Sequence, residues 1–217
     1  MINPDAIEFE TNTDDRCACV LLLDTSASMD GKFIRELNQG LQAFEADIKQ
    51  DDLARRRVEV AIVTFGNGGV QIAQDFIIAG KFQARTLTAG GDTPMGRAIN
   101  LALDMIRTRK ETYKEHDILY YRPWIFMITD GEPTDEWKTA AQRVQTEEAA
   151  NGVAFFAVGV SHANMQTLAK IAVRPPMKLD ERKFVDMFLW LSRSQARVSA
   201  SKPGEMTALP PVGWGAV

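Results

Sequence analysis

The chain alternates short apolar runs with longer segments in which apolar residues recur every three or four positions. The short runs predict β-strands, and nearly continuous apolar runs are typical of strands covered on both faces. We expect strands at 17–24, 58–65, 70–76, 123–130, 153–160 and 177–179. The periodic segments predict amphipathic helices at 32–50, 94–112, 135–150, 164–172 and 181–199.

The order of these elements predicts an α/β fold: a doubly wound, mostly parallel six-stranded sheet with helices on both faces. The Gly-rich stretch at 66–69 separates the second and third strands and indicates a hairpin, so we expect the third strand to be an antiparallel edge strand. The domain is expected over 16–200, between a polar N-terminal segment at 1–15 and a Pro/Gly-rich, non-helical tail at 201–217. Trp214 is compatible with a tail that docks on the domain and with a loose tail.

The composition of the chain argues against several classes of protein. The 217 residues carry 25 Lys and Arg against 29 Asp and Glu, a net charge of −4, which argues against a nucleic-acid binder. No apolar run approaches the roughly 18 residues of a membrane span. The acidic first 16 residues lack the basic start and apolar stretch of a signal peptide. Cys17 and Cys19 lie two apart on one strand, which is poor disulfide geometry. We therefore expect buried free thiols and a cytoplasmic protein.

Three loops concentrate oxygen-bearing side chains where buried strands end and where the 94–112 helix begins. In open α/β sheets, ligands bind beyond the carboxyl ends of the strands. The candidate residues are Asp24, Ser26 and Ser28 after the first strand, Thr93 before the helix, and Asp130 after the fourth strand. Two carboxylates and three hydroxyls, without His or Cys, favour Mg²⁺, with Mn²⁺ or Ca²⁺ as alternatives, over zinc or copper.

Each of these residues also has an ordinary structural interpretation. Asp24 fits the cap of a turn, and Thr93 and Pro94 fit the N-cap and first residue of a helix. Thr134 similarly fits the cap of the helix at 135–150. For each residue taken singly, the structural interpretation is favoured. For all of them together it is not, because it would require a coincidence in three loops at one edge of the sheet.

The motifs DTSASMDG, GGDTPMG and ITDGEPTDEW resemble the von Willebrand factor type A (VWA) domain and its metal-ion-dependent adhesion site (MIDAS). The resemblance covers about residues 15–195 and is nearer to the bacterial tellurite-resistance-associated (TerY-like) branch. It implies that Ser26 and Ser28 bind the metal directly. Thr93 would bind directly or through water depending on the state of the domain, and Asp24 and Asp130 directly or through bridging water.

The resemblance implies a binding module, not an enzyme: the metal accepts a carboxylate from a partner protein. In the TerY-like branch the implied partners are stress-response proteins, including a protein kinase and a metal-dependent (PP2C-type) protein phosphatase. The alternative is a haloacid-dehalogenase-type phosphohydrolase with Asp24 as nucleophile. That chemistry needs a second Asp two residues later as acid/base, and Ser26 occupies that position.

Overall fold

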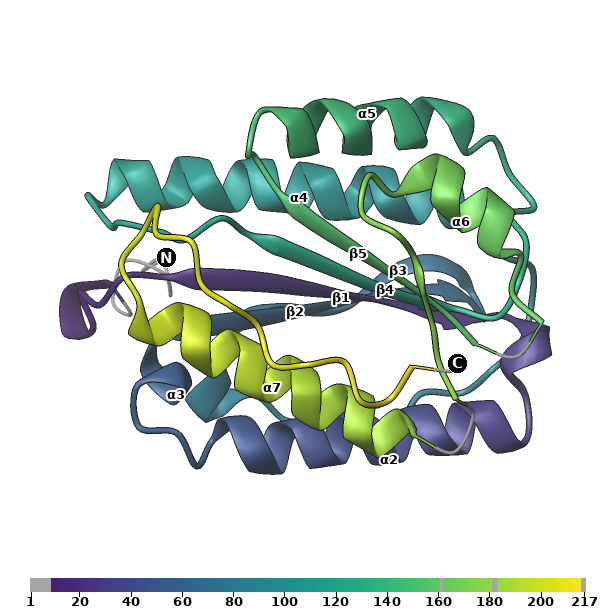
Figure 1. Ribbon diagram of the computed structural model, residues 1–217, viewed down its shortest axis with the longest axis horizontal. Helices are drawn as coiled ribbons and strands as arrows, with labels where there is room; N and C mark the ends of the chain where they lie inside the picture. Colours follow the sequence, from purple (N-terminus) through teal and green to yellow (C-terminus); the bar gives the residue numbers. More distant parts are fainter. Residues whose placement is uncertain (1–8, 161, 181–182, 216–217) are drawn as a thin grey trace.

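The computed structural model describes residues 9–160, 162–180 and 183–215. A six-stranded sheet in the order β3-β2-β1-β4-β5-β6 forms its centre (Figure 1). All neighbouring strands are parallel except β2 and β3, which pair antiparallel at one edge. The predicted fold class is therefore confirmed. The strands are β1 (Cys17–Thr25), β2 (Val58–Gly66), β3 (Gly69–Ile78), β4 (Trp124–Thr129), β5 (Ala154–Gly159) and β6 (Met177–Lys178).

Helices cover both faces of the sheet, because the inner strands are apolar on both sides. Figure 1 shows α2 and α7 beneath one face, and α4, α5 and α6 above the other. A short helix, α3, which the sequence pattern did not predict, lies on the side of α2. The helices are α2 (Lys32–Ile48), α3 (Ala54–Arg57), α4 (Met95–Glu115), α5 (Lys138–Ala149), α6 (Met165–Ile171) and α7 (Phe184–Ala200). The predicted start of the last helix, at 181–182, lies outside the described residues.

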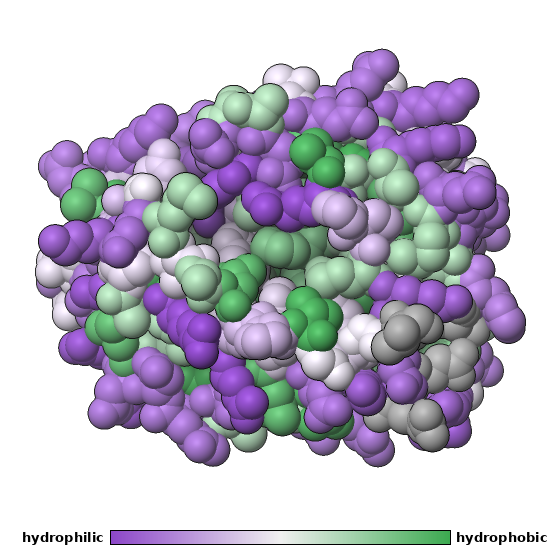
Figure 2. Space-filling model, in the orientation of Figure 1, coloured by the Kyte–Doolittle hydropathy of each residue, from purple (hydrophilic) through white to green (hydrophobic). Residues whose placement is uncertain are grey.

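The surface and the interior divide as expected for a globular domain. Figure 2 shows hydrophilic residues over most of the visible surface, with hydrophobic residues in smaller groups between them. Within the described part of the chain, no helix is both long and apolar enough to cross a membrane.

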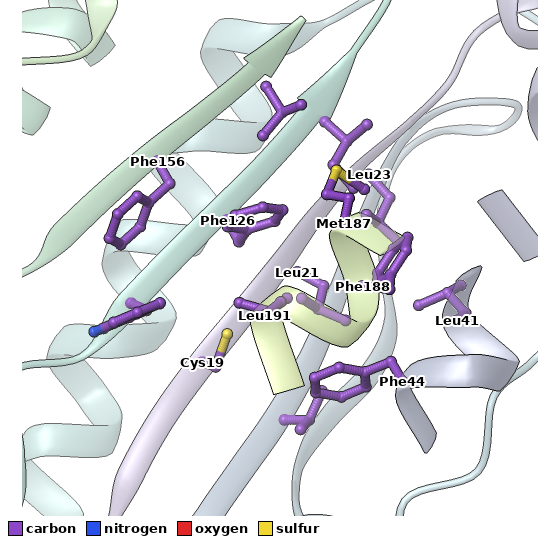
Figure 3. Close-up of a cluster of buried hydrophobic side chains, with 14 of the residues drawn as sticks. Cys19, Leu21, Leu23, Leu41, Phe44, Phe126, Phe156, Met187, Phe188 and Leu191 are labelled. Atoms are coloured by element: carbon purple, nitrogen blue, oxygen red, sulfur yellow. The ribbon is translucent and has the colours of Figure 1, made fainter. Parts of the chain in front are cut away.

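Strand β1 supplies alternate side chains to two separate cores. Leu21 and Leu23 pack with residues of α2 and α7, as Figure 3 shows around Phe44 and Phe188. Val20 and Leu22 face the opposite way, toward α4 and α5. Because successive side chains of a strand point to opposite faces, a continuous apolar strand has to be covered on both.

The two cysteines follow the same alternation. Cys17 and Cys19 are both free and fully buried in the core between the sheet and helices α2 and α7. Burial raises the pKa of Cys17 to about 12. The prediction of buried thiols, with no disulfide between them, is confirmed.

The C-terminal tail docks on the domain. Trp214 is only 1% exposed and meets Trp190 of α7 edge to face, with ring centroids 5.7 Å apart. The Trp190 indole Nε1 donates to the Pro210 carbonyl oxygen at 2.8 Å, and Gly215 forms an antiparallel bridge with Leu179. The tail therefore lies against α7 and beside the residue that follows β6.

A buried charge cluster closes the end of the sheet where β1 and β2 begin. Glu59 of β2 is 1% exposed. Its carboxylate accepts hydrogen bonds from Arg16 Nε at 3.2 Å, Arg109 Nε at 2.7 Å and the Tyr113 hydroxyl at 2.5 Å. The ring of Phe9 lies 5.2 Å from the guanidinium carbons of both Arg16 and Arg109. These contacts fix the described part of the predicted polar N-terminal segment, of which residues 1–8 lie outside the described part.

Candidate metal centre

Asp24 lies at the base of the site, near the carboxyl end of β1. Its side chain is fully buried. Oδ1 accepts a hydrogen bond from the Ser26 backbone N–H at 2.8 Å, and Oδ2 accepts one from the Thr129 hydroxyl at 2.5 Å. Burial raises the pKa of Asp24 to about 6, although the hydrogen bonds from Ser26 and Thr129 oppose this shift. A buried carboxylate of this kind favours a bound cation, because the cation stabilises its charged form.

Two hydroxyls connect this base to the second carboxylate. The Oγ atoms of Ser26 and Ser28 lie 3.0 Å apart, and Ser28 Oγ donates to Asp130 Oδ1 at 2.7 Å. Burial raises the pKa of Asp130, while the bond from Ser28 opposes that shift. Oxygen ligands about 2.1 Å from an octahedral Mg²⁺ are about 3.0 Å from one another. The observed oxygen spacing is thus close to that of a cation's ligand shell.

Thr93 borders the same space from the second loop and is 6% exposed. The position of the Thr93 hydroxyl can be given relative to Gly131. A Cβ added to Gly131 would lie 3.3 Å from Thr93 Oγ1 and 3.7 Å from Ser28 Oγ. The two hydroxyls therefore flank one point above Gly131. The structure brings together the five predicted site residues, Asp24, Ser26, Ser28, Thr93 and Asp130.

Backbone hydrogen bonds hold the first loop against the second. The Ala27 N–H donates to the Gly91 carbonyl oxygen at 3.1 Å, and the Gly90 N–H donates to the Thr25 carbonyl oxygen at 2.9 Å. Gly66, with φ +146°, packs directly on this turn: an added Cβ would lie 2.1 Å from the carbonyl carbon of Thr25. Only glycine fits there without moving the loop that carries the serines.

Two predicted helix caps are wrong. Helix α4 begins at Met95, and Pro94, not Thr93, occupies the cap position, without a side-chain cap. The Asp135 carboxylate instead accepts the Gly96 and Arg97 N–H groups, both at 2.9 Å. A carboxylate from the neighbouring loop thus satisfies the free N–H groups of the first turn and interacts favourably with the helix dipole.

Thr134 does not cap the next helix either. Its hydroxyl accepts the Thr93 N–H at 3.1 Å, and its own N–H donates to the Thr93 carbonyl oxygen at 3.0 Å. Helix α5 therefore begins at Lys138, later than predicted, where Glu136 accepts the Lys138 N–H at 2.7 Å. The residues expected to start α5 hold the third loop to the second instead.

The donor set fits a hard divalent cation. Among the described residues, no three His, Cys, Asp or Glu side chains form a metal-binding group. The site depends instead on hydroxyl oxygens combined with two carboxylates, which suits Mg²⁺, Mn²⁺ or Ca²⁺ and not a soft metal.

Sequence reasoning missed two residues that position the ligands. Thr129 orients Asp24, and Asp135 ties the third loop to α4. The signal for Thr129 was its place at the end of the fourth apolar run, directly before Asp130. No local signal marked Asp135, because its hydrogen-bond partners are 38 and 39 residues away.

Comparison with known proteins identifies the family. Residues 19–187 match the model of the von Willebrand factor type A domain, and the chain belongs to this family. VWA domains are protein-interaction modules, often with a metal-ion-dependent adhesion site. No curated protein matches the chain significantly.

Solved structures share the fold at low sequence identity. The open pilus adhesin SpaC from Lactobacillus rhamnosus GG superposes with a TM-score of 0.70 at 14% identity, over 86% of this chain and 31% of the adhesin. The SpRpn10 VWA domain gives 0.59 at 14% identity, over 79% of this chain and 93% of that domain. Proximal thread matrix protein 1 from the mussel byssus, with a zinc-occupied MIDAS motif, gives 0.56 at 17% identity, over 85% and 49%. This chain thus spans about a third of the adhesin and half of the thread matrix protein.

Proposed function

We propose that this VWA domain is a metal-ion-dependent protein-interaction module. One observation carries the proposal: loops far apart in sequence bring hydroxyl and carboxylate oxygens together at one edge of the sheet. Ser26, Ser28 and Asp130 are linked at 2.7–3.0 Å, and Thr93 borders the same space beside Gly131. The metal is Mg²⁺, with Mn²⁺ or Ca²⁺ as alternatives. The ligands are Asp24, Ser26, Ser28, Thr93 and Asp130.

The metal provides a positive charge that a partner's carboxylate can approach. Asp24 is buried at the base of the site, whereas Ser28 is exposed, so the open side of the site faces the solvent. Three of the five proposed ligands are neutral hydroxyls, and only two are carboxylates. Because so few of the ligands are anionic, the divalent cation stays electrophilic enough to accept an acidic side chain from a partner protein.

The motifs DTSASM, GGDTPMG and TDGEPTD support a finer assignment to the TerY-like branch. We place the domain in the cytoplasm as a scaffold or switch in a tellurite or chemical stress-response assembly. Its partners there are a protein kinase and a metal-dependent protein phosphatase. Retention of either protein on the immobilised domain should require Mg²⁺ and should be lost with Asp24→Ala.

The geometry favours binding over phosphoryl transfer. Phosphoryl transfer through Asp24 would need a carboxyl group two residues later as general acid/base, but Ser26 stands there, and its Oγ lies 3.0 Å from Ser28 Oγ. Hydrolysis of an aryl phosphate that Asp24→Asn abolishes would overturn this preference.

Thermal unfolding tests the metal site. A ligand present at about 100 times its Kd adds about 2.7 kcal/mol to the unfolding free energy, which raises the Tm of a domain this size by about 5–10 °C. We expect that shift with Mg²⁺ relative to chelator in the wild type and in Asp52→Ala, whose carboxylate is solvent-exposed. Asp24→Ala should show no shift. Equal melting of the wild type with Mg²⁺ and with chelator would refute the metal site.

A further inference from the structure

A cavity of about 910 Å³ lies at the edge of the sheet opposite the metal site. It opens where β4 and β5 begin, next to Trp124 and Ala154, and the C-terminal tail at 204–209 forms one wall. On the face shown in Figure 2, a hollow containing hydrophobic side chains opens among hydrophilic ones. The volume lies within the range of small-molecule sites, about 300–1,000 Å³.

Aromatic rings line the inner part of the cavity. Trp124 and Phe156 both contribute to the lining, and their ring centroids are 4.5 Å apart with planes inclined by 40°. Both side chains are almost buried. Their exposed parts give the inner wall a rigid apolar surface for the aromatic body of a ligand, and ring pairs at such distances are favourable.

Basic side chains surround these rings. Arg122, Arg174 and Lys110 contribute to the lining. One buried carboxylate, Glu148, is shared by two of them: its Oε2 lies 2.5 Å from Arg122 Nη2, and its Oε1 lies 3.1 Å from Arg174 Nε. Two guanidinium groups share one carboxylate, so this group of three side chains carries one positive charge in excess, whereas Lys110 is paired with Glu147 at 3.7 Å. The acidic lining residue, Glu205, accepts the Lys202 N–H at 3.0 Å.

Donor groups remain available toward the cavity. The hydrogen bonds recorded for Arg122 and Arg174 use Nε and Nη2, so the Nη1 of each can donate to a ligand. The Arg174 guanidinium also lies over Phe156, with its carbon 5.2 Å from the ring centroid, so charge and aromatic surface adjoin.

We propose that this cavity binds a small organic anion with a flat aromatic body. The rings of Trp124 and Phe156 would contact the aromatic part. Arg122 and Arg174 would bind the carboxylate, sulfonate or phosphate group, since guanidinium groups form strong charge-assisted hydrogen bonds to such oxygens. The site is separate from the metal centre and does not depend on the proposed interaction function.

Calorimetric titration of the full chain with 2-naphthoate, in the presence of chelator, tests the site without the metal. We expect saturable binding with one ligand per chain and about tenfold weaker binding by Arg174→Gln. Arg107→Gln is the matched control, because Arg107 lies on α4, is 66% exposed and does not contribute to the lining. The neutral 2-naphthamide should bind at least about tenfold more weakly than 2-naphthoate.

A second variant blocks the cavity without removing a buried group. Ala150 is an exposed lining residue at the end of α5, and Ala150→Trp should abolish naphthoate binding while the unfolding midpoint is unchanged. This readout holds even if Arg174→Gln fails to fold. The proposal is overturned if the wild type shows no saturable binding, if the amide binds as tightly as the acid, or if both arginine variants lose affinity equally.

Discussion

Thr129→Val removes one hydroxyl next to the metal site and leaves the shape of the side chain almost unchanged. Thr129 is fully buried on β4, and its hydroxyl donates to Asp24 Oδ2 at 2.5 Å. The substitution leaves that oxygen of a fully buried carboxylate without its donor. Hydrogen bonds to charged groups contribute about 1.5–3 kcal/mol, and loss of a residue that orients a metal ligand weakens metal binding about 10–100-fold. We therefore expect Mg²⁺ binding to fall by that factor.

Calorimetric titration with Mg²⁺ measures the effect, and denaturant unfolding in chelator separates it from a loss of stability. Thr64→Val provides the matched control, because Thr64 is also buried, on β2 at the other side of β1, and is not among the hydrogen-bond partners of Asp24. The control should bind Mg²⁺ with wild-type affinity. If Thr129→Val binds Mg²⁺ as tightly as the wild type, Asp24 does not act as a ligand in the orientation that the structure gives it.

Three further substitutions test other parts of the structure. Gly131→Ala should weaken Mg²⁺ binding in calorimetry, because its Cβ would lie 3.3 Å from Thr93 Oγ1; unchanged affinity would move the site away from this glycine. Glu59→Gln should lower the free energy of unfolding by about 3–5 kcal/mol in urea, because the buried carboxylate that Arg16 and Arg109 share is neutralised, and a loss below about 0.5 kcal/mol would contradict the buried cluster. Trp214→Ala should cost about 3–5 kcal/mol, as is usual for a buried Trp, with a red shift of tryptophan fluorescence as Trp190 is uncovered. An unchanged spectrum would mean that the tail does not dock in solution.

Local pattern predicted the elements because each depends on residues close together in the chain. The apolar run at 17–24 became β1, and the hairpin signal at 66–69 became the antiparallel pair of β2 and β3. The grouping of the five candidate residues was also predictable, because strand ends are visible as the limits of apolar runs. Since parallel strands end at the same edge of the sheet, loops distant in sequence were expected to meet there.

Helix starts were less predictable, because long-range hydrogen bonds replaced local caps. Thr93 and Thr134 have the side chains of N-caps, yet each binds the other's loop. Asp135, predicted to lie in the first turn of a helix, caps a different helix instead. Propensity describes what a residue can do locally, whereas the fold decides which partner is within reach.

The sequence by itself determined the α/β order, the antiparallel edge strand and the gathering of oxygen-bearing side chains at one sheet edge, since these follow from hydrophobic periodicity and from chain order. Only the tertiary structure decided that Trp214 docks on Trp190. It also placed Thr129 on Asp24 and gathered two arginines around Glu148 beside a cavity. Each of these depends on contacts between residues far apart in the chain. Such contacts arise from packing, and they leave no periodic signal in the sequence.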